Sequence, residues 1–186
     1  MIYLLRHGED DETRVGGYSD VSLTDIGKSQ IEQIAKYIKE NLNIKRIYTS
    51  DIKRAKETSD IVNKYLNLKI IEDKNLRELD KGLLTGRRKI SLTERELQNL
   101  NTKDIHEKIL GGESMNDLYN RIYNLYKNDY FIDKDNSLFV THRGVINMIY
   151  TIINKEEVTM DKEKYHVTHG SLHQMDVKKK QIVKIK

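Results

Sequence analysis

Residues 1–8 read Met1-Ile2-Tyr3-Leu4-Leu5-Arg6-His7-Gly8, a short apolar run that ends in two basic side chains and a glycine. The run has the length of a buried strand. Residues 137–144, Ser137-Leu138-Phe139-Val140-Thr141-His142-Arg143-Gly144, have the same organisation. The sequence therefore predicts two buried strands, each followed directly by a histidine.

Outward from these two runs, strands and helices are expected to alternate. Thr24 to Leu42 places apolar residues at helical spacing, and Thr24 suits the position that caps a helix. Further helices are expected from about Asp51 to Leu66, over Glu113–Asp129 and through Ile146–Ile153, with strands over Lys45–Thr49 and Lys69–Ile71 and a final hairpin over His173–Val177 and Gln181–Ile185. Residues 75–88 are expected to form a loop, and the polar residues 89–110 are only weakly helical.

This alternation predicts an α/β fold, a three-layer sandwich whose mostly parallel central sheet carries helices on both faces. The sequence contains no internal repeat and no linker. We therefore expect one domain over residues 1–186, with a lid insertion around residues 88–112.

The composition excludes several classes of protein. The 37% hydrophobic content of the 186 residues is too high for a disordered chain. No cysteine is present, which excludes disulfides, thiol catalysis and cysteine-ligated zinc. No apolar run approaches the roughly 20 residues that cross a bilayer, and the first residues lack the basic start and long apolar stretch of a secretory signal. A cytoplasmic enzyme or binding protein is the expectation, and the net charge of +4 suits an anionic small molecule as well as nucleic acid.

Reactive side chains follow several of the predicted strands. Arg6 and His7 follow the first strand, Arg54 the second, Glu78 the third, and His142 the strand that ends at Thr141. Ligands of such sheets bind beyond the carboxyl ends of the strands. We therefore expect these five side chains to meet around one crevice, although 135 residues separate the two histidines.

This set of residues suits phosphoryl transfer. Arginine forks match phosphate oxygens, and a neutral imidazole whose far nitrogen is held by a backbone carbonyl can attack phosphorus in line. Arg6, Arg54 and a protonated His142 would stabilise the charge on the transferring group. A carboxylic acid, Glu78, would protonate the leaving oxygen and then activate water, with Asp80 as the other candidate. No metal or cofactor is required for this chemistry.

Several segments in order resemble the histidine phosphatase superfamily, the phosphoglycerate-mutase-like enzymes. The similar segments are Leu4–Glu9, Ser22–Gly27, Tyr48–Thr58, Asn75–Gly86, Gly111–Ser114 and Val140–Ile146, which together cover most of the chain. The resemblance implies that His7 is the nucleophile, Glu78 the acid, and His142, Arg6 and Arg54 the remaining catalytic groups. It also implies that Arg6, Gly8, Gly17, Arg54 and Arg143 bind substrate.

The departures from the family pattern favour a phosphatase over a mutase. Asp10, Asp11, Glu12 and Thr13 replace the family's Thr and Trp-Asn, and in mutases that Asn helps to bind substrate. Only 64 residues separate Glu78 from His142, whereas mutases carry a longer insertion there. Arg143 replaces the usual glycine, and it either adds a third cation to the pocket or points to solvent.

Three functions are compatible with these residues. The first is a metal-independent phosphomonoesterase that acts on a small phosphorylated metabolite, such as alpha-ribazole phosphate, a sugar phosphate or a phosphoglycerate, with neither nucleic acid nor membrane as partner. The second is a phosphoglycerate mutase. The third is a non-catalytic protein that binds a phosphorylated ligand.

Three other patterns have simpler interpretations. His166, His169 and His173 have a spacing that suggests a metal site, but a segment that leads into a strand would not bring three imidazoles together. Lys178–Lys180 are expected to form a solvated turn. The acidic run Glu9–Glu12 is likewise expected to be solvated.

Overall fold

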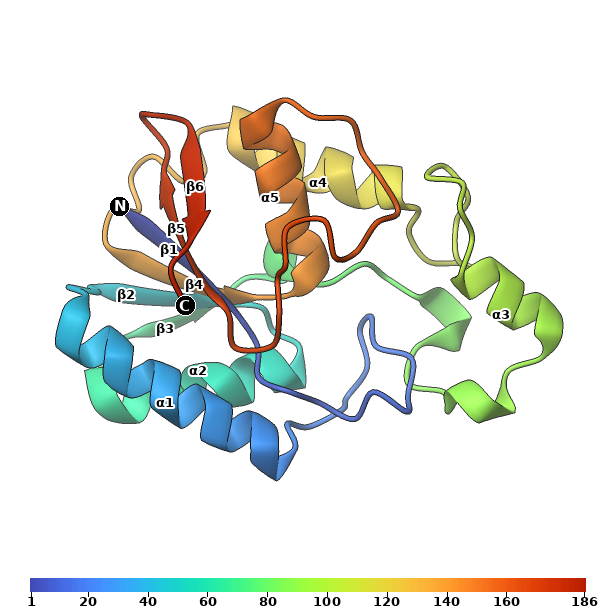
Figure 1. Cartoon of the computed structure of the whole chain (residues 1–186), viewed down its shortest axis with the longest axis horizontal. Helices are drawn as coiled ribbons and strands as arrows, with labels where there is room; N and C mark the ends of the chain where they lie inside the picture. The colour runs from blue at the N-terminus through green and yellow to red at the C-terminus, as the bar shows by residue number, and fades with distance from the viewer.

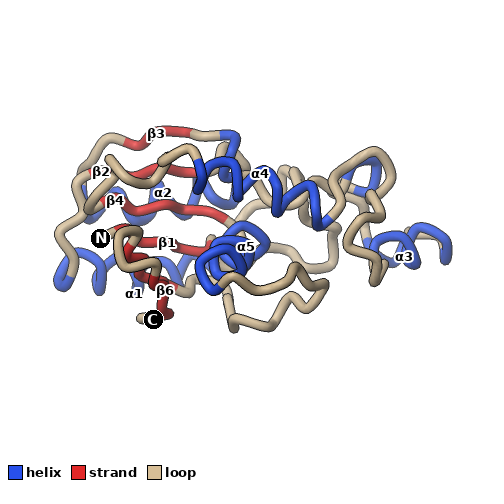
Figure 2. Tube along the Cα trace, turned by 90° about the horizontal axis from the view of Figure 1, so that it is seen from above, coloured by secondary structure: helices blue, strands red, loops and turns tan.

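A six-stranded sheet forms the centre of the computed structural model, which describes residues 1–186 (Figure 1). The strand order is β3-β2-β4-β1-β5-β6, and Figure 2 shows the strands side by side. The strands are β1 (Ile2–Arg6), β2 (Arg46–Thr49), β3 (Ile70–Glu72), β4 (Ser137–Thr141), β5 (Leu172–Asp176) and β6 (Gln181–Lys184). The first four in this order run parallel, and the last two form an antiparallel hairpin at the edge. The expected mostly parallel sheet is confirmed.

The two runs that end in histidine are neighbours in the sheet. Every residue of β1 and of β4 is buried, as expected for strands covered on both faces. Arg6 pairs with Thr141 in register, so that His7 and His142 leave the sheet at the same level. The pairing of these two strands therefore brings together residues that are far apart in the sequence.

Helices cover both faces of the sheet and complete the three layers (Figure 1). Helices α1 (Asp25–Asn41) and α2 (Lys53–Leu66) pack on one face, and α4 (Met115–Lys127) and α5 (Arg143–Asn154) pack on the other. Thr24 caps α1 as expected, because its side chain accepts a hydrogen bond from the Gly27 N–H at 3.0 Å. None of the helices has the length and apolar character needed to cross a membrane.

The segment 88–112 stands apart from the sheet. It contains the short helix α3 (Glu94–Leu100), which lies at the far end of the molecule in both views (Figures 1 and 2). A capping box between Thr93 and Glu96 starts this helix. Gly82, at φ +50°, sits where the segment returns, and a Cβ there would lie 2.3 Å from the Leu110 carbonyl oxygen. The backbone therefore closes tightly at the base of the segment.

Short 3-10 turns account for much of the remaining irregular chain. They span Lys74–Leu76, Gly82–Leu84 and Lys89–Ser91. Residues 75–88, expected to be a loop, thus include one complete turn of this kind and most of another.

Candidate active site

His7 is buried directly beyond the end of β1. Its backbone N–H donates to the Thr141 carbonyl at 3.0 Å, and its Nδ1 donates to the Gly8 carbonyl at 2.7 Å. This second bond places the ring proton on Nδ1 and leaves a lone pair on Nε2. Burial, and then the positive charge of Arg54, lower the pKa of His7 well below its usual range. The imidazole is therefore neutral and able to act as a nucleophile.

His142 lies beside His7, with the two ring centroids 5.1 Å apart. It is the residue before α5 and is completely buried. The Ser50 hydroxyl oxygen accepts from the Ile52 N–H, so its own hydrogen is free to donate to His142 Nε2 at 2.9 Å. The His142 proton then sits on Nδ1, which is buried without a hydrogen-bond partner. His142 thus holds one unused donor next to His7.

The expectation of a protonated His142 is wrong for the free site. Burial first, and then the charges of Arg54 and Arg6, lower the pKa of His142 well below its usual range. A third positive charge so close to two guanidiniums is unfavourable in a buried environment. His142 is therefore a neutral donor rather than a cation.

Arg54, from the first turn of α2, directs all three of its nitrogens into the site. Its Nε donates to His7 Nε2 at 3.2 Å, Nη1 to the Ser19 hydroxyl at 3.3 Å, and Nη2 to the Gly17 carbonyl at 2.8 Å. Only 2% of the residue is exposed, so this geometry is fixed by the surrounding protein. The guanidinium therefore lies beside the free Nε2 lone pair of His7.

Arg6 supplies the second guanidinium. Its Nη1 donates to the Val167 carbonyl at 2.8 Å, and its Nη2 lies 2.6 Å from His169 Nε2. Burial, and then repulsion from Arg143, lower the pKa of Arg6 to about 10. Arg6 nevertheless remains positively charged at neutral pH. The end of β1 and the first turn of α2 thus place two cations around His7, as expected from the sequence.

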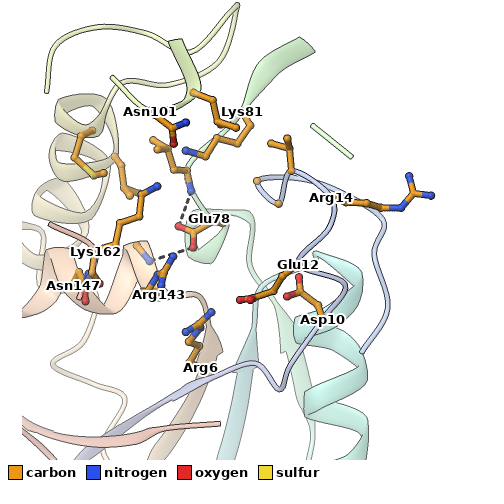
Figure 3. A pocket seen from close by; sticks show the side chains of 18 of the residues that line it. Arg6, Asp10, Glu12, Arg14, Glu78, Lys81, Asn101, Arg143, Asn147 and Lys162 are labelled. Carbon is orange, nitrogen blue, oxygen red and sulfur yellow. Dashed lines mark hydrogen bonds between the residues drawn. The ribbon is translucent and has the colours of Figure 1, made fainter. Parts of the chain in front are cut away.

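Glu78 reaches the same cavity from the loop after β3 (Figure 3). Its Oε1 accepts from the Leu79 N–H at 2.9 Å, and its Oε2 accepts from the Gly144 N–H at 3.2 Å. Asp80, the other candidate acid, instead accepts from the Gly82 N–H at 2.8 Å and does not line the cavity. The structure therefore favours Glu78 over Asp80 as the acid.

Two of the residues expected to bind substrate have other positions or contacts. Gly8 does not line the cavity, and its N–H donates to the Thr58 hydroxyl at 3.2 Å. Its expected role in substrate binding is not supported, because both of its backbone groups are already used, the carbonyl by His7. Gly17 lines the cavity, and its carbonyl also positions Arg54.

Arg143 lies on the cavity side of α5. It is one of the lining residues, and its Nη1 pairs with Glu163 at 2.5 Å. Of the two alternatives for this residue, the structure thus favours the additional cation near the pocket.

Asp10 is a site residue that the sequence interpretation missed. Only 13% of its side chain is exposed, and it lines the cavity instead of being solvated (Figure 3). The backbone of Asp10 forms an isolated antiparallel β-bridge with Leu23, which holds the loop at Asp10. Its Oδ2 lies 3.4 Å from Arg54 Nε, and its Oδ1 lies 3.7 Å from His169 Nε2. The local acidic pattern gave no signal that one of its carboxylates would turn inward.

His169 also belongs to the site, whereas His166 and His173 do not. His173 is buried in β5 between the Tyr150 and Ser171 hydroxyls, and His166 is exposed. Because β5 is antiparallel to β1, its amino end lies at the carboxyl end of β1. The direction of this strand is the signal that would have placed His169 in the site.

His7, Asp10 and His169 form a set of metal-ligating side chains whose ligand atoms lie within 4.8 Å of one another. Two guanidiniums already contact the imidazole nitrogens of this set. A metal cation would therefore meet positive charge, and the arrangement is better suited to an anion.

The whole cavity has a volume of about 320 Å³, and its outer part is built from other segments. Its lining includes Lys81, Leu97, Leu100, Asn101, Asn147 and Lys162. Burial, and then repulsion from Lys162, lower the pKa of Lys81 to about 8. In Figure 3, Lys81 and Asn101 lie beyond Glu78 as seen from Arg6. The sequence interpretation identified none of these side chains individually.

Comparison with known proteins assigns this arrangement to a family. The profile described as histidine phosphatase superfamily (branch 1) matches residues 2–185. The chain belongs to the histidine phosphatase superfamily. The similarity inferred from the ordered motifs is thereby confirmed.

Curated relatives of this histidine phosphatase superfamily chain are named as probable mutases. A probable phosphoglycerate mutase GpmB from Salmonella paratyphi A is 40% identical over 132 residues, which cover 66% of this chain and 60% of the relative. The chain thus spans about 60% of the length of the curated relatives it matches.

Solved structures confirm the superfamily fold. A putative alpha-ribazole-5'-P phosphatase from Escherichia coli superposes with a TM-score of 0.82 at 19% identity, covering 98% of this chain and 93% of that one. YhfR from Bacillus stearothermophilus gives a TM-score of 0.78 at 23% identity, with 94% and 91% covered. A mycobacterial glucosyl-3-phosphoglycerate phosphatase gives 0.70 at 21% identity, with 92% and 87% covered.

Proposed function

We propose that this chain is a phosphomonoester hydrolase that works through a phosphohistidine on His7. The observation that carries the proposal is the orientation of His7. Its Nδ1 is bound to the Gly8 carbonyl, so that Nε2 keeps a lone pair beside Arg54. An activated imidazole next to a buried guanidinium is what an attack on a phosphoryl group requires.

The first half of the reaction transfers the phosphoryl group to the enzyme. Arg6, Arg54 and the Nδ1 donor of His142 bind the equatorial oxygens as His7 Nε2 forms a bond to phosphorus. The bond between phosphorus and the ester oxygen breaks, and a protonated Glu78 gives its proton to that oxygen. The alcohol leaves, and the phosphoenzyme and a Glu78 carboxylate remain.

The second half releases phosphate. The Glu78 carboxylate takes a proton from water as the water oxygen attacks phosphorus, and the bond between phosphorus and Nε2 breaks. Inorganic phosphate leaves, and both His7 and Glu78 return to their starting states. Each half of the cycle uses only side chains of the chain itself.

The size and lining of the cavity support a substrate class. A volume of about 320 Å³ suits a small phosphorylated metabolite, and the lining combines cations with the apolar Leu97 and Leu100. Since both leucines come from residues 88–112, we also propose that this segment is a lid on a single domain over residues 1–186. Alpha-ribazole phosphate, sugar phosphates and phosphoglycerates form the first screening panel.

The test is hydrolysis of p-nitrophenyl phosphate in the presence of EDTA, with the wild type beside His7→Ala. We expect the wild type to be active with the chelator and the variant to lose activity while keeping its fold. His166→Asn is the control, because His166 is exposed and does not line the cavity, and asparagine tolerates its positive φ of 49°. Full activity in His7→Ala would refute the mechanism.

A phosphoglycerate mutase is the second candidate, favoured by the 40% identity to a probable phosphoglycerate mutase. Such an enzyme has the same centre but keeps its phosphoenzyme long enough to rephosphorylate the product. Interconversion of the two phosphoglycerates in an assay primed with 2,3-bisphosphoglycerate would establish it. Binding of phosphate without turnover on any phosphoester would instead favour a non-catalytic protein.

A further inference from the structure

The carboxylate of Asp10 occupies part of the anion-binding pocket. It lies 3.4 Å from Arg54 Nε, the same nitrogen that donates to His7 Nε2 at 3.2 Å. Asp10 and the nucleophile therefore share one edge of the guanidinium. A phosphoryl group that approaches His7 Nε2 must place an oxygen near this edge.

Asp10 is the only carboxylate within ion-pair distance of Arg54. Arg54 is almost completely buried, and a buried guanidinium without a negative partner is strongly unfavourable. The contact therefore stabilises the empty pocket. The His169 ring lies beside the inward-turned carboxylate, with its Nε2 3.7 Å from the other oxygen of Asp10.

The neighbouring acidic side chains of Asp11 and Glu12 do not contact Arg54. Glu12 also lies 3.7 Å from His169, but 70% of its side chain is exposed. Asp11 is bound to the Thr13 hydroxyl at 2.6 Å and pairs with Arg14. The burial and the contact with Arg54 distinguish Asp10 from the rest of the acidic run.

We propose that Asp10 is an internal counter-anion that competes with the phosphoryl group of the substrate for Arg54, and so sets the affinity of the site for phosphate. This inference rests on the proposed function, because it assumes that the pocket receives a phosphoryl group. The competition weakens the binding of inorganic phosphate and favours its release after each turnover. Asp10 is thus a residue that determines affinity and not a catalytic residue.

The test measures binding of inorganic phosphate to the full chain by titration calorimetry. Asp10→Asn keeps the shape of the side chain and removes its charge, so we expect the dissociation constant for phosphate to fall at least about tenfold. Asp133→Asn is the matched control. It removes the same charge from an exposed position before β4, at the end of that strand opposite to the site, and should leave the constant unchanged.

Thermal unfolding provides a second measurement on the same variants. Without phosphate, Asp10→Asn should melt at a lower temperature than the wild type, because Arg54 loses its partner. With phosphate, its melting temperature should rise more than that of the wild type. An unchanged or weaker phosphate affinity in Asp10→Asn would overturn the proposal and make Asp10 a residue that only positions Arg54.

The outcome is separable from that of the proposed function. Turnover of p-nitrophenyl phosphate by the wild type reports on catalysis, whereas the ratio of the two dissociation constants reports on Asp10. A wild type that binds phosphate without turnover would refute the phosphatase and still test the counter-anion. Failure of both wild type and Asp10→Asn to bind phosphate would overturn both proposals.

Discussion

The carboxylate of Glu78 lies against the backbone of Gly144, with its Oε2 accepting the Gly144 N–H at 3.2 Å. A Cβ on residue 144 would stand 2.1 Å from Glu78 Oε1, a distance that no real contact allows. Because α5 begins just after His142, the same helical turn positions the proposed acid and the second histidine. Glycine at position 144 therefore has a direct steric reason.

The first prediction follows from this contact. Gly144→Ala should displace Glu78 and lower kcat by a factor of about 10² or more, because a misplaced acid cannot protonate the leaving oxygen. Steady-state kinetics should be compared for Gly144→Ala, Glu78→Gln and the double variant. If the alanine acts through Glu78, kcat of the double variant should be no lower than kcat of Glu78→Gln alone. Normal kcat in Gly144→Ala would contradict the steric argument.

The second prediction concerns the three contacts of Arg54. Arg54→Lys retains the charge but cannot reproduce donation to His7, Ser19 and Gly17 together, so kcat/KM should fall by about 10²–10³. Arg46→Lys is the control, since Arg46 is exposed at the start of β2, away from the site. Equal losses in the two variants would mean that the geometry of Arg54 is unimportant.

The third prediction uses the lowered pKa of Lys81, about 8. Below that pH its ammonium attracts an anionic group on the alcohol part of a substrate, and above it this attraction is lost. KM for such substrates should therefore rise as the pH passes through 8, while KM for p-nitrophenyl phosphate, whose leaving group carries no such anion, should not show this rise. Lys81→Gln should remove the pH-dependent rise. A rise that persists in the variant would assign it to another group.

The fourth prediction concerns folding stability below neutral pH. Burial, and then the charge of Lys184, lower the pKa of His173 to about 4, so the folded protein binds its proton less readily than the unfolded chain does. The unfolded state therefore gains protons as the pH falls below about 6.5, and stability decreases toward pH 4. His173 alone should contribute a loss of about 2 kcal/mol between pH 7 and pH 5.

Urea unfolding at pH 7 and pH 5 measures this loss. His7 and His142 act in the same direction, because burial lowers the pKa of both. The wild type should therefore lose stability between these pH values, and His173→Gln should lose less of it. His106→Gln, at an exposed position, should behave like the wild type. An equal loss of unfolding free energy between pH 7 and pH 5 in His173→Gln and the wild type would contradict the prediction.

The sheet is predictable from the sequence because its strands are short apolar runs with clear ends. The predicted strand over residues 137–141 coincides with β4, and helix α1 begins at its predicted cap. The segment 89–110 is less predictable, since a polar stretch has no apolar period. Its helix α3 begins with a capping box between Thr93 and Glu96, a local pattern that apolar periodicity does not detect.

The side chains at strand ends are also predictable, because the sheet carries them directly to one edge. Asp10, His169 and Lys81 are not, because their positions depend on how loops fold over that edge and on the direction of β5. The protonation state of His142 differs from the expected one for a related reason. It depends on burial and on the number of nearby cations, which a sequence pattern does not report.

The strand order has a consequence for how the protein is made. Strand β1 pairs only with β4 and β5, and β2 pairs only with β3 and β4. Strands β1 and β2 are therefore not paired with each other, and β4 must form before they join one sheet. On the ribosome, residues 2–6 emerge early and remain without a partner strand until residues 137–141 have been synthesised. His7 meets His142 only after this long-range pairing. A nascent chain that stops before residue 137 therefore lacks an assembled candidate site, whatever local helices it has formed.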